Sequence, residues 1–71
     1  MDKPAVYRIK VRGVLPDSWI DRLGGLEITA ETSEGLTLEG WLPDQAALFG
    51  VLDTIYELHL CLLEVIRLQE H

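Results

Sequence analysis

The chain has 71 residues, 48% of them apolar, and a formal net charge of −6. An acidic chain lacks the positive surface that phosphate contacts require, which argues against nucleic acid and anionic membranes as partners. No stretch reaches the roughly 18 apolar residues of a transmembrane helix, and the start lacks the apolar core of a signal peptide. The single cysteine, Cys61, excludes an internal disulfide. We therefore expect one small cytoplasmic domain over residues 1–71.

The first predicted element is a strand at about residues 5–13, in which apolar and cationic residues alternate. Alternation of this kind places one set of side chains on each face of a strand. We expect the apolar set to face the core and the cationic set to face outward. The two sets are Tyr7, Ile9 and Val11 and, opposite them, Arg8, Lys10 and Arg12. The cations form either a solvated charge ladder beside acidic neighbours, which we favour, or a small anion-binding strip.

A short helix is predicted at residues 16–23, where Trp19 should pack against the sheet. The pair Gly24-Gly25 ends it, and we expect one of the two to adopt a left-handed conformation. Two strands follow at about residues 26–31 and 36–42, joined by a tight hairpin that contains Gly35. By alternation, Glu39 and Trp41 of the second of these strands face outward.

The main helix is predicted at residues 44–59, with Asp44 as its N-cap. Apolar residues at the i, i+3, i+4, i+7 spacing predict its buried stripe. These residues are Leu48, Val51, Leu52, Ile55 and Leu58. Gly50 lies on the opposite side, and either a close backbone approach or tolerance at an exposed position explains it. Phe49 and Tyr56 either flank the buried stripe or form a second contact strip.

The last predicted strand, at about residues 60–68, has aliphatic residues at both parities, which predicts burial on both faces. Its parity stays open at this point. If Leu63 and Val65 face the helices, then Leu62, Ile66 and Leu68 lie on the open side of the sheet together with Trp41. That arrangement would create an apolar patch, and such patches usually mark contacts.

In this order the elements predict an α+β fold of the ferredoxin-like β-α-β-β-α-β type. We expect an antiparallel four-stranded sheet in the order 4-1-3-2 with both helices on one face. Acidic residues on the neighbouring strands, Glu39 and Glu64, can then neutralise the cations of the first strand. Because a monomer should not expose the apolar patch, we expect a homodimer or a larger homo-oligomer. The candidate interface comprises Trp41, Leu62, Ile66, Leu68, Arg8, Lys10, Arg12 and Glu39.

Several segments follow a recognisable pattern. They are Y-R-I-K-V-R-G at residues 7–13, Trp19, Gly25-Leu26, L-E-G at 38–40 and D-Q-A-A-L-F-G-V-L at 44–52. With these motifs, nearly the whole chain resembles a family of short uncharacterised bacterial proteins, which implies a bacterial origin and a shared fold but no activity. Members of that family often carry glycine after the main helix, where this chain has His59. A weaker resemblance, at the level of the fold, is to ACT-type regulatory domains, which bind small molecules between subunits.

Residues that could carry chemistry do not converge in the sequence. Cys61 and His59 lie close together, but nucleophilic catalysis also needs a group that orients the base. A metal site needs three or four converging ligands, and no phosphate-binding glycine motif is present. We therefore expect no enzyme activity, cofactor or metal. The leading hypothesis is a non-enzymatic, self-associating interaction module, and the alternative is an ACT-like sensor with a small-molecule ligand at the subunit interface.

Overall fold

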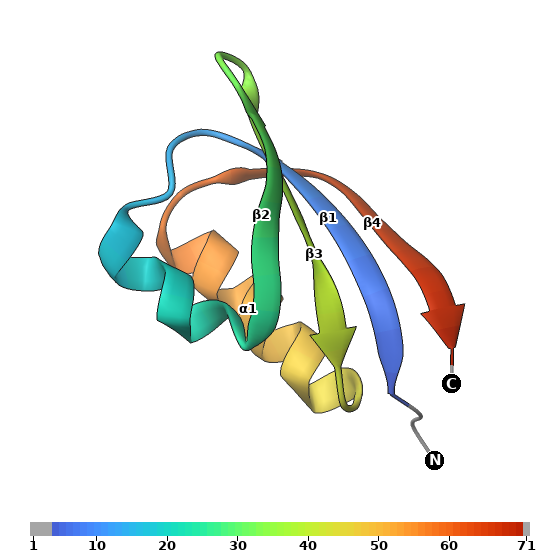
Figure 1. Cartoon of the computed structure of the whole chain (residues 1–71). Helices are drawn as coiled ribbons and strands as arrows, with labels where there is room; N and C mark the ends of the chain where they lie inside the picture. The colour runs from blue at the N-terminus through green and yellow to red at the C-terminus, as the bar shows by residue number, and fades with distance from the viewer. Residues whose placement is uncertain (1–3, 71) are drawn as a thin grey trace.

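The computed structural model describes residues 4–70 and shows an antiparallel sheet with helical segments on one side (Figure 1). In chain order the elements are β1 (Ala5–Arg12), η1 (Asp17–Leu23), β2 (Gly25–Thr32), β3 (Gly35–Leu42), α1 (Gln45–Glu57) and β4 (Cys61–Glu70). α1 and the 3-10 helix η1 lie beside each other on the same side of the sheet. The opposite side of the sheet is the open face.

The four strands lie in the order β2-β3-β1-β4, which is the predicted order 4-1-3-2. All neighbouring pairs are antiparallel. On the central strand β1, Arg8 is opposite Glu39 of β3 on one side and Ile66 of β4 on the other. β2 and β4 are therefore the two edges of the sheet.

The prediction of a two-helix, ferredoxin-like β-α-β-β-α-β fold was wrong. Residues Asp17–Leu23 form a 3-10 helix, so residues 4–70 contain one α-helix and consist mostly of sheet. The segment has only seven residues between Pro16 and Gly24, and Pro16 provides no side-chain cap. A helix this short forms few hydrogen bonds for the residues that it orders, so nucleation of an α-helix is unfavourable and a 3-10 turn is typical. The bond from the Trp19 amide to the Pro16 carbonyl, at 2.9 Å, has the i→i+3 spacing of such a turn.

The core lies between the sheet and the helical layer. The predicted alternation of β1 is confirmed, because its apolar set is buried, and Trp19 packs against the core as predicted. From α1, Val51 and Ile55 are fully buried, whereas the rest of the predicted stripe is only half-buried. The buried side chains are Ala5, Tyr7, Ile9, Val11, Leu15, Leu23, Leu26, Leu36, Leu38, Leu42, Val51 and Ile55.

Two glycines occupy positions that other residues would not tolerate. Gly24 has a φ of 64°, which agrees with the predicted glycine stop after the short helix. Gly40 lies in β3 where β2 approaches closely, and a Cβ atom there would collide with the Gly25 carbonyl. Gly50 differs, because a Cβ atom there would meet nothing within 4 Å. No close approach explains Gly50, so it lies at a tolerant, exposed position.

Candidate interaction surface

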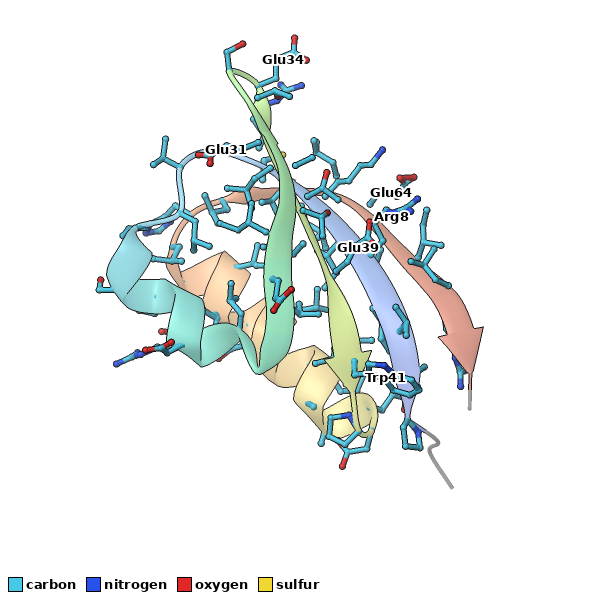
Figure 2. All side chains as sticks on the ribbon, in the orientation of Figure 1. Arg8, Glu31, Glu34, Glu39, Trp41 and Glu64 are labelled. Carbon is cyan, nitrogen blue, oxygen red and sulfur yellow. The ribbon has the colours of Figure 1, made fainter. Side chains whose placement is uncertain are left out.

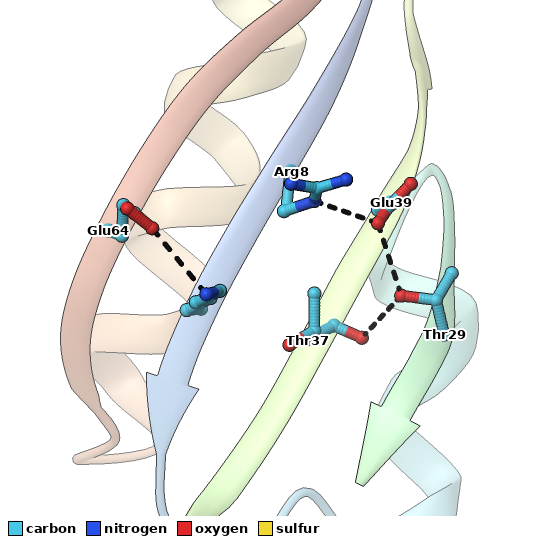
Figure 3. A network of polar contacts seen from close by, with 6 residues as sticks. Arg8, Thr29, Thr37, Glu39 and Glu64 are labelled. Atoms are coloured by element: carbon cyan, nitrogen blue, oxygen red, sulfur yellow. Dashed lines mark hydrogen bonds and ion pairs between the residues drawn. The ribbon is translucent and has the colours of Figure 1, made fainter.

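The middle of the open face carries a ladder of charged side chains. Arg8 Nε donates a hydrogen bond to Glu39 Oε2 at 2.9 Å, and Thr29 Oγ1 lies 3.5 Å from the same carboxylate oxygen (Figure 3). On the other side of β1, Lys10 Nζ lies 3.8 Å from Glu64 Oε1. The cations of β1 therefore face carboxylates on both neighbouring strands. This geometry favours a charge ladder over an anion-binding strip.

The third cation of β1 lies at the hairpin end of the sheet. Arg12 lines an open hollow together with Glu31 and Glu34. Figure 2 shows the two glutamates on and beside the hairpin between β2 and β3. Two carboxylates beside one guanidinium repel an anion. Arg12 is thus a poor anchor for a negatively charged ligand.

Apolar side chains lie at the two flanks of this ladder. Trp41 lies on β3 opposite Val6 and has 44% of its surface exposed (Figure 2). On β4, four aliphatic side chains are exposed: Leu62 by 44%, Leu63 by 51%, Val65 by 37% and Leu68 by 39%. Ile66 is half-buried opposite Arg8. Four of the eight large apolar side chains that are exposed in the described part of the chain thus lie on the edge strand β4, although Val14, in the loop after β1, is more exposed, at 82%.

The parity of β4 that the sequence left open is settled by two irregularities in its pairing with β1. Val65 is opposite Ile9, on the side of the helices, and Ile66 is opposite Arg8, on the open face. One register shift skips Leu63, so Leu62 pairs with the buried Val11 and not with an open-face residue. A second shift skips Leu68. Strict alternation therefore does not hold along β4, because a β-bulge inserts an unpaired residue.

The sequence predicted burial on both faces of this strand and left its parity open, so the exposure of Leu63 and Val65 differs from that expectation. Within Cys61–Leu68 no side chain is fully buried. The predicted strand order already placed this strand at an edge of the sheet, where it has a neighbouring strand on one side only. That position is the sequence signal that could have identified the exposed β4 residues.

With this geometry established, comparison with known proteins identifies the family. Residues 6–66 match the family described as "Domain of unknown function (DUF8691)". The chain belongs to this family. The expectation that the chain belongs to an uncharacterised family is thereby confirmed, whereas this match supports neither the bacterial origin nor the resemblance to ACT-type domains. No curated protein and no solved structure is significantly similar to the chain.

The helix of this DUF8691 domain exposes two aromatic side chains. Phe49 is 59% exposed and Tyr56 is 78% exposed, so neither is covered by the core. They lie seven residues apart, two turns along the same side of α1. Of the two interpretations from the sequence, the structure supports an exposed strip.

Groups that could support chemistry are sparse in the described part of the DUF8691 domain. Among residues 4–70, no three or more His, Cys, Asp or Glu side chains are grouped so that they could hold a metal ion. Cys61 is an exposed free thiol at the start of β4, and His59 is exposed in the turn before it. Neither helix in residues 4–70 combines the length and the apolar character that crossing a membrane requires.

Proposed function

We propose that this DUF8691 protein is a non-enzymatic module that acts by associating with itself. The observation that carries the proposal is the exposed apolar surface of the edge strand β4. Contiguous exposed apolar surface on a small protein is typical of an interaction site. A domain of 71 residues also has a limited core, and burial against a second copy is a common way to complete it.

The charges near this surface are compatible with contact between copies. Each molecule carries a net charge of −6, which opposes association at long range. On the open face, however, Arg8 is paired with Glu39 and Lys10 lies beside Glu64, so that this region is close to neutral. Neutral, partly apolar surface is where identical acidic molecules meet with least repulsion.

The setting that we propose is the bacterial cytoplasm. The motif resemblance supports the bacterial origin. The exposed thiol of Cys61 is compatible with a reducing compartment.

The alternative, an ACT-like sensor, has less support. The hollow that Lys10, Thr37 and Leu63 help to line has a volume of about 250 Å³, and the hollow beside Arg12, Glu31 and Glu34 has about 550 Å³; both are open to solvent. Ligand pockets of about 300–1,000 Å³ enclose most of the ligand, and an open hollow does not. A thermal-shift screen with amino acids and nucleotides tests this alternative, because a ligand at one hundred times its Kd adds about 2.7 kcal/mol. We expect no shift.

The direct test of self-association is the molar mass of the wild-type chain in solution. Light scattering should give twice the chain mass of 8.0 kDa, about 16 kDa, or a larger multiple. The measurement is repeated over a dilution series, in which the mass should fall towards that of one chain. A mass of 8.0 kDa at every concentration contradicts the proposal.

A further inference from the structure

We infer that two copies join by pairing their β4 strands edge to edge, so that two four-stranded sheets become one continuous sheet. The inference rests on the proposed self-association and adds the segment of the partner that is bound. Three observations support it: β4 is an unpaired edge, apolar side chains lie on both of its faces, and the opposite edge, β2, is unsuited to the same contact.

The first step is the backbone of β4. This strand pairs with β1 on one side and is last in the strand order, so its other side has no neighbouring strand among residues 4–70. An edge strand of this kind presents amide and carbonyl groups that a strand from another chain can pair with. Ten residues at about 3.4 Å each reach roughly 34 Å. β4 is therefore nearly as long as the 36 Å longest dimension of the molecule, and its bulges at Leu63 and Leu68 divide the edge that a partner strand can pair with.

The second step is the distribution of the exposed aliphatic side chains. Val65 is on the helix-facing side, opposite Ile9, and Leu62 pairs with the core residue Val11. Leu63 instead borders the hollow on the open face, beside Lys10. A partner packed on the open face alone would leave Val65 exposed, and a partner packed on the helix side alone would leave Leu63 exposed. A strand added beside β4 shields both faces at once.

The third step is the comparison of the two edges. β2 carries Glu27 and Glu31 without a cation, and none of its large apolar side chains is exposed. Two β2 edges would bring like charges together, which is unfavourable across paired strands. β4 carries the cation Arg67 as well as Glu64 and Glu70, and it contains four of the exposed large apolar side chains. The edge that a second copy can approach with the smaller charge conflict is therefore β4.

A two-fold axis gives the assembly a defined size. When the same edge is used on both copies, the contact closes on itself and leaves the two β2 strands as the outer edges. Pairing of β4 with β2 of the next copy would instead continue without limit. Edge-to-edge pairing through β4 thus predicts a dimer and no larger polymer.

The experiment compares charged substitutions on the edge with matched substitutions elsewhere. Leu63→Lys and Val65→Lys place a cation on the β4 edge, while Phe49→Lys on α1 is the control with similar exposure. By light scattering, the two edge variants should fall from twice the chain mass to the 8.0 kDa of one chain, and the Phe49→Lys control should keep the wild-type mass. Trp41→Glu, on the open face but away from the edge, should keep the dimer as well. Circular dichroism confirms that each variant is folded.

The outcomes separate the inference from the function on which it rests. A wild-type chain that is monomeric throughout overturns the proposed function. A dimeric wild type in which Trp41→Glu separates the copies, while Leu63→Lys and Val65→Lys do not, retains self-association and overturns edge pairing in favour of contact through the open face. A mass that grows continuously with concentration also overturns the two-fold β4 contact.

Hydrogen exchange of the wild-type chain decides the matter if the edge variants fail to fold. Amides of residues 61–68 should exchange more slowly in concentrated than in dilute solution, because the partner strand protects them only in the dimer. Amides of residues 25–32, on the opposite edge, should exchange at the same rate in both. Equal exchange of residues 61–68 at both concentrations, in a chain that is dimeric at the higher one, contradicts the inference.

Discussion

His59 has a backbone conformation that side chains other than glycine rarely adopt, with a φ of 59°. It follows the last turn of α1, where the Leu60 amide donates to the Ile55 carbonyl at 3.2 Å and the His59 amide donates to the Tyr56 carbonyl at 3.0 Å. These two bonds form a Schellman motif, whose left-handed position is most often glycine. His59 therefore adopts, at a cost, a conformation that glycine adopts freely.

Replacement of His59 by glycine should therefore stabilise the fold. We expect His59→Gly to raise the free energy of unfolding by about 1 kcal/mol, since the left-handed conformation costs other residues roughly that amount. Urea denaturation measures the change. His59→Ala is the control, because alanine keeps the Cβ atom and should give no gain. Equal stability of the glycine and alanine variants would show that the turn is not strained.

Alanine substitutions at Gly40 and Gly50 should change the stability of the fold in opposite directions. Gly50→Ala should stabilise the chain by about 0.5–1 kcal/mol, because alanine favours a helix and the space around this position is open. Gly40→Ala should destabilise it by about 1–3 kcal/mol, because the added Cβ forces β2 away from β3. Thermal unfolding followed by circular dichroism distinguishes them. A loss of stability in Gly50→Ala would point to a contact on this side of α1.

At the scale of elements, α1 begins at a cap that the sequence predicted. Asp44 Oδ1 accepts a hydrogen bond from the Ala47 amide at 2.8 Å. Asp44→Ala should lower the free energy of unfolding by about 1 kcal/mol, whereas Asp44→Ser, which retains a capping oxygen, should cost clearly less. Chemical denaturation of the two variants side by side tests the cap. Similar losses in both would assign the effect to the charge of Asp44 and not to its hydrogen bond.

The elements differ in how far the sequence could predict them. The spacing of apolar residues alone predicts β1 and α1, because each has a long, regular apolar repeat. The pairing of Arg8 with Glu39 follows from the predicted strand order. The segment 17–23 has the composition of a helix, but its seven residues are too few to nucleate an α-helix. On β4, the bulges at Leu63 and Leu68 arise from pairing with β1, and no residue type in the sequence marks them.

The candidate surface was only partly predictable for the same reason. Trp41 is exposed, as its parity in β3 indicated. The exposure of Val65 depends on how much of the sheet one helix and one 3-10 helix can cover, which is a property of the assembled layers. A run of aliphatic residues has the same sequence pattern whether its second face meets a helix, a partner or water.

For the whole molecule, net charge opposes association and apolar contact favours it. Added salt distinguishes the two effects, because it screens only the first. Two copies that each carry a net charge of −6 repel one another at long range, and this repulsion is screened as the Debye length falls to about 8 Å at physiological ionic strength. The half-buried pair of Arg8 and Glu39 lies within one chain and contributes about 1 kcal/mol, so its weakening by salt changes folding little. Added salt should therefore strengthen dimerisation, and the Kd from sedimentation equilibrium should decrease as sodium chloride is raised. An interface held by opposite charges between the copies would show the reverse dependence, with dissociation on adding salt. The sign of the salt effect thus distinguishes an apolar contact between acidic molecules from a contact made by the charged ladder of the open face.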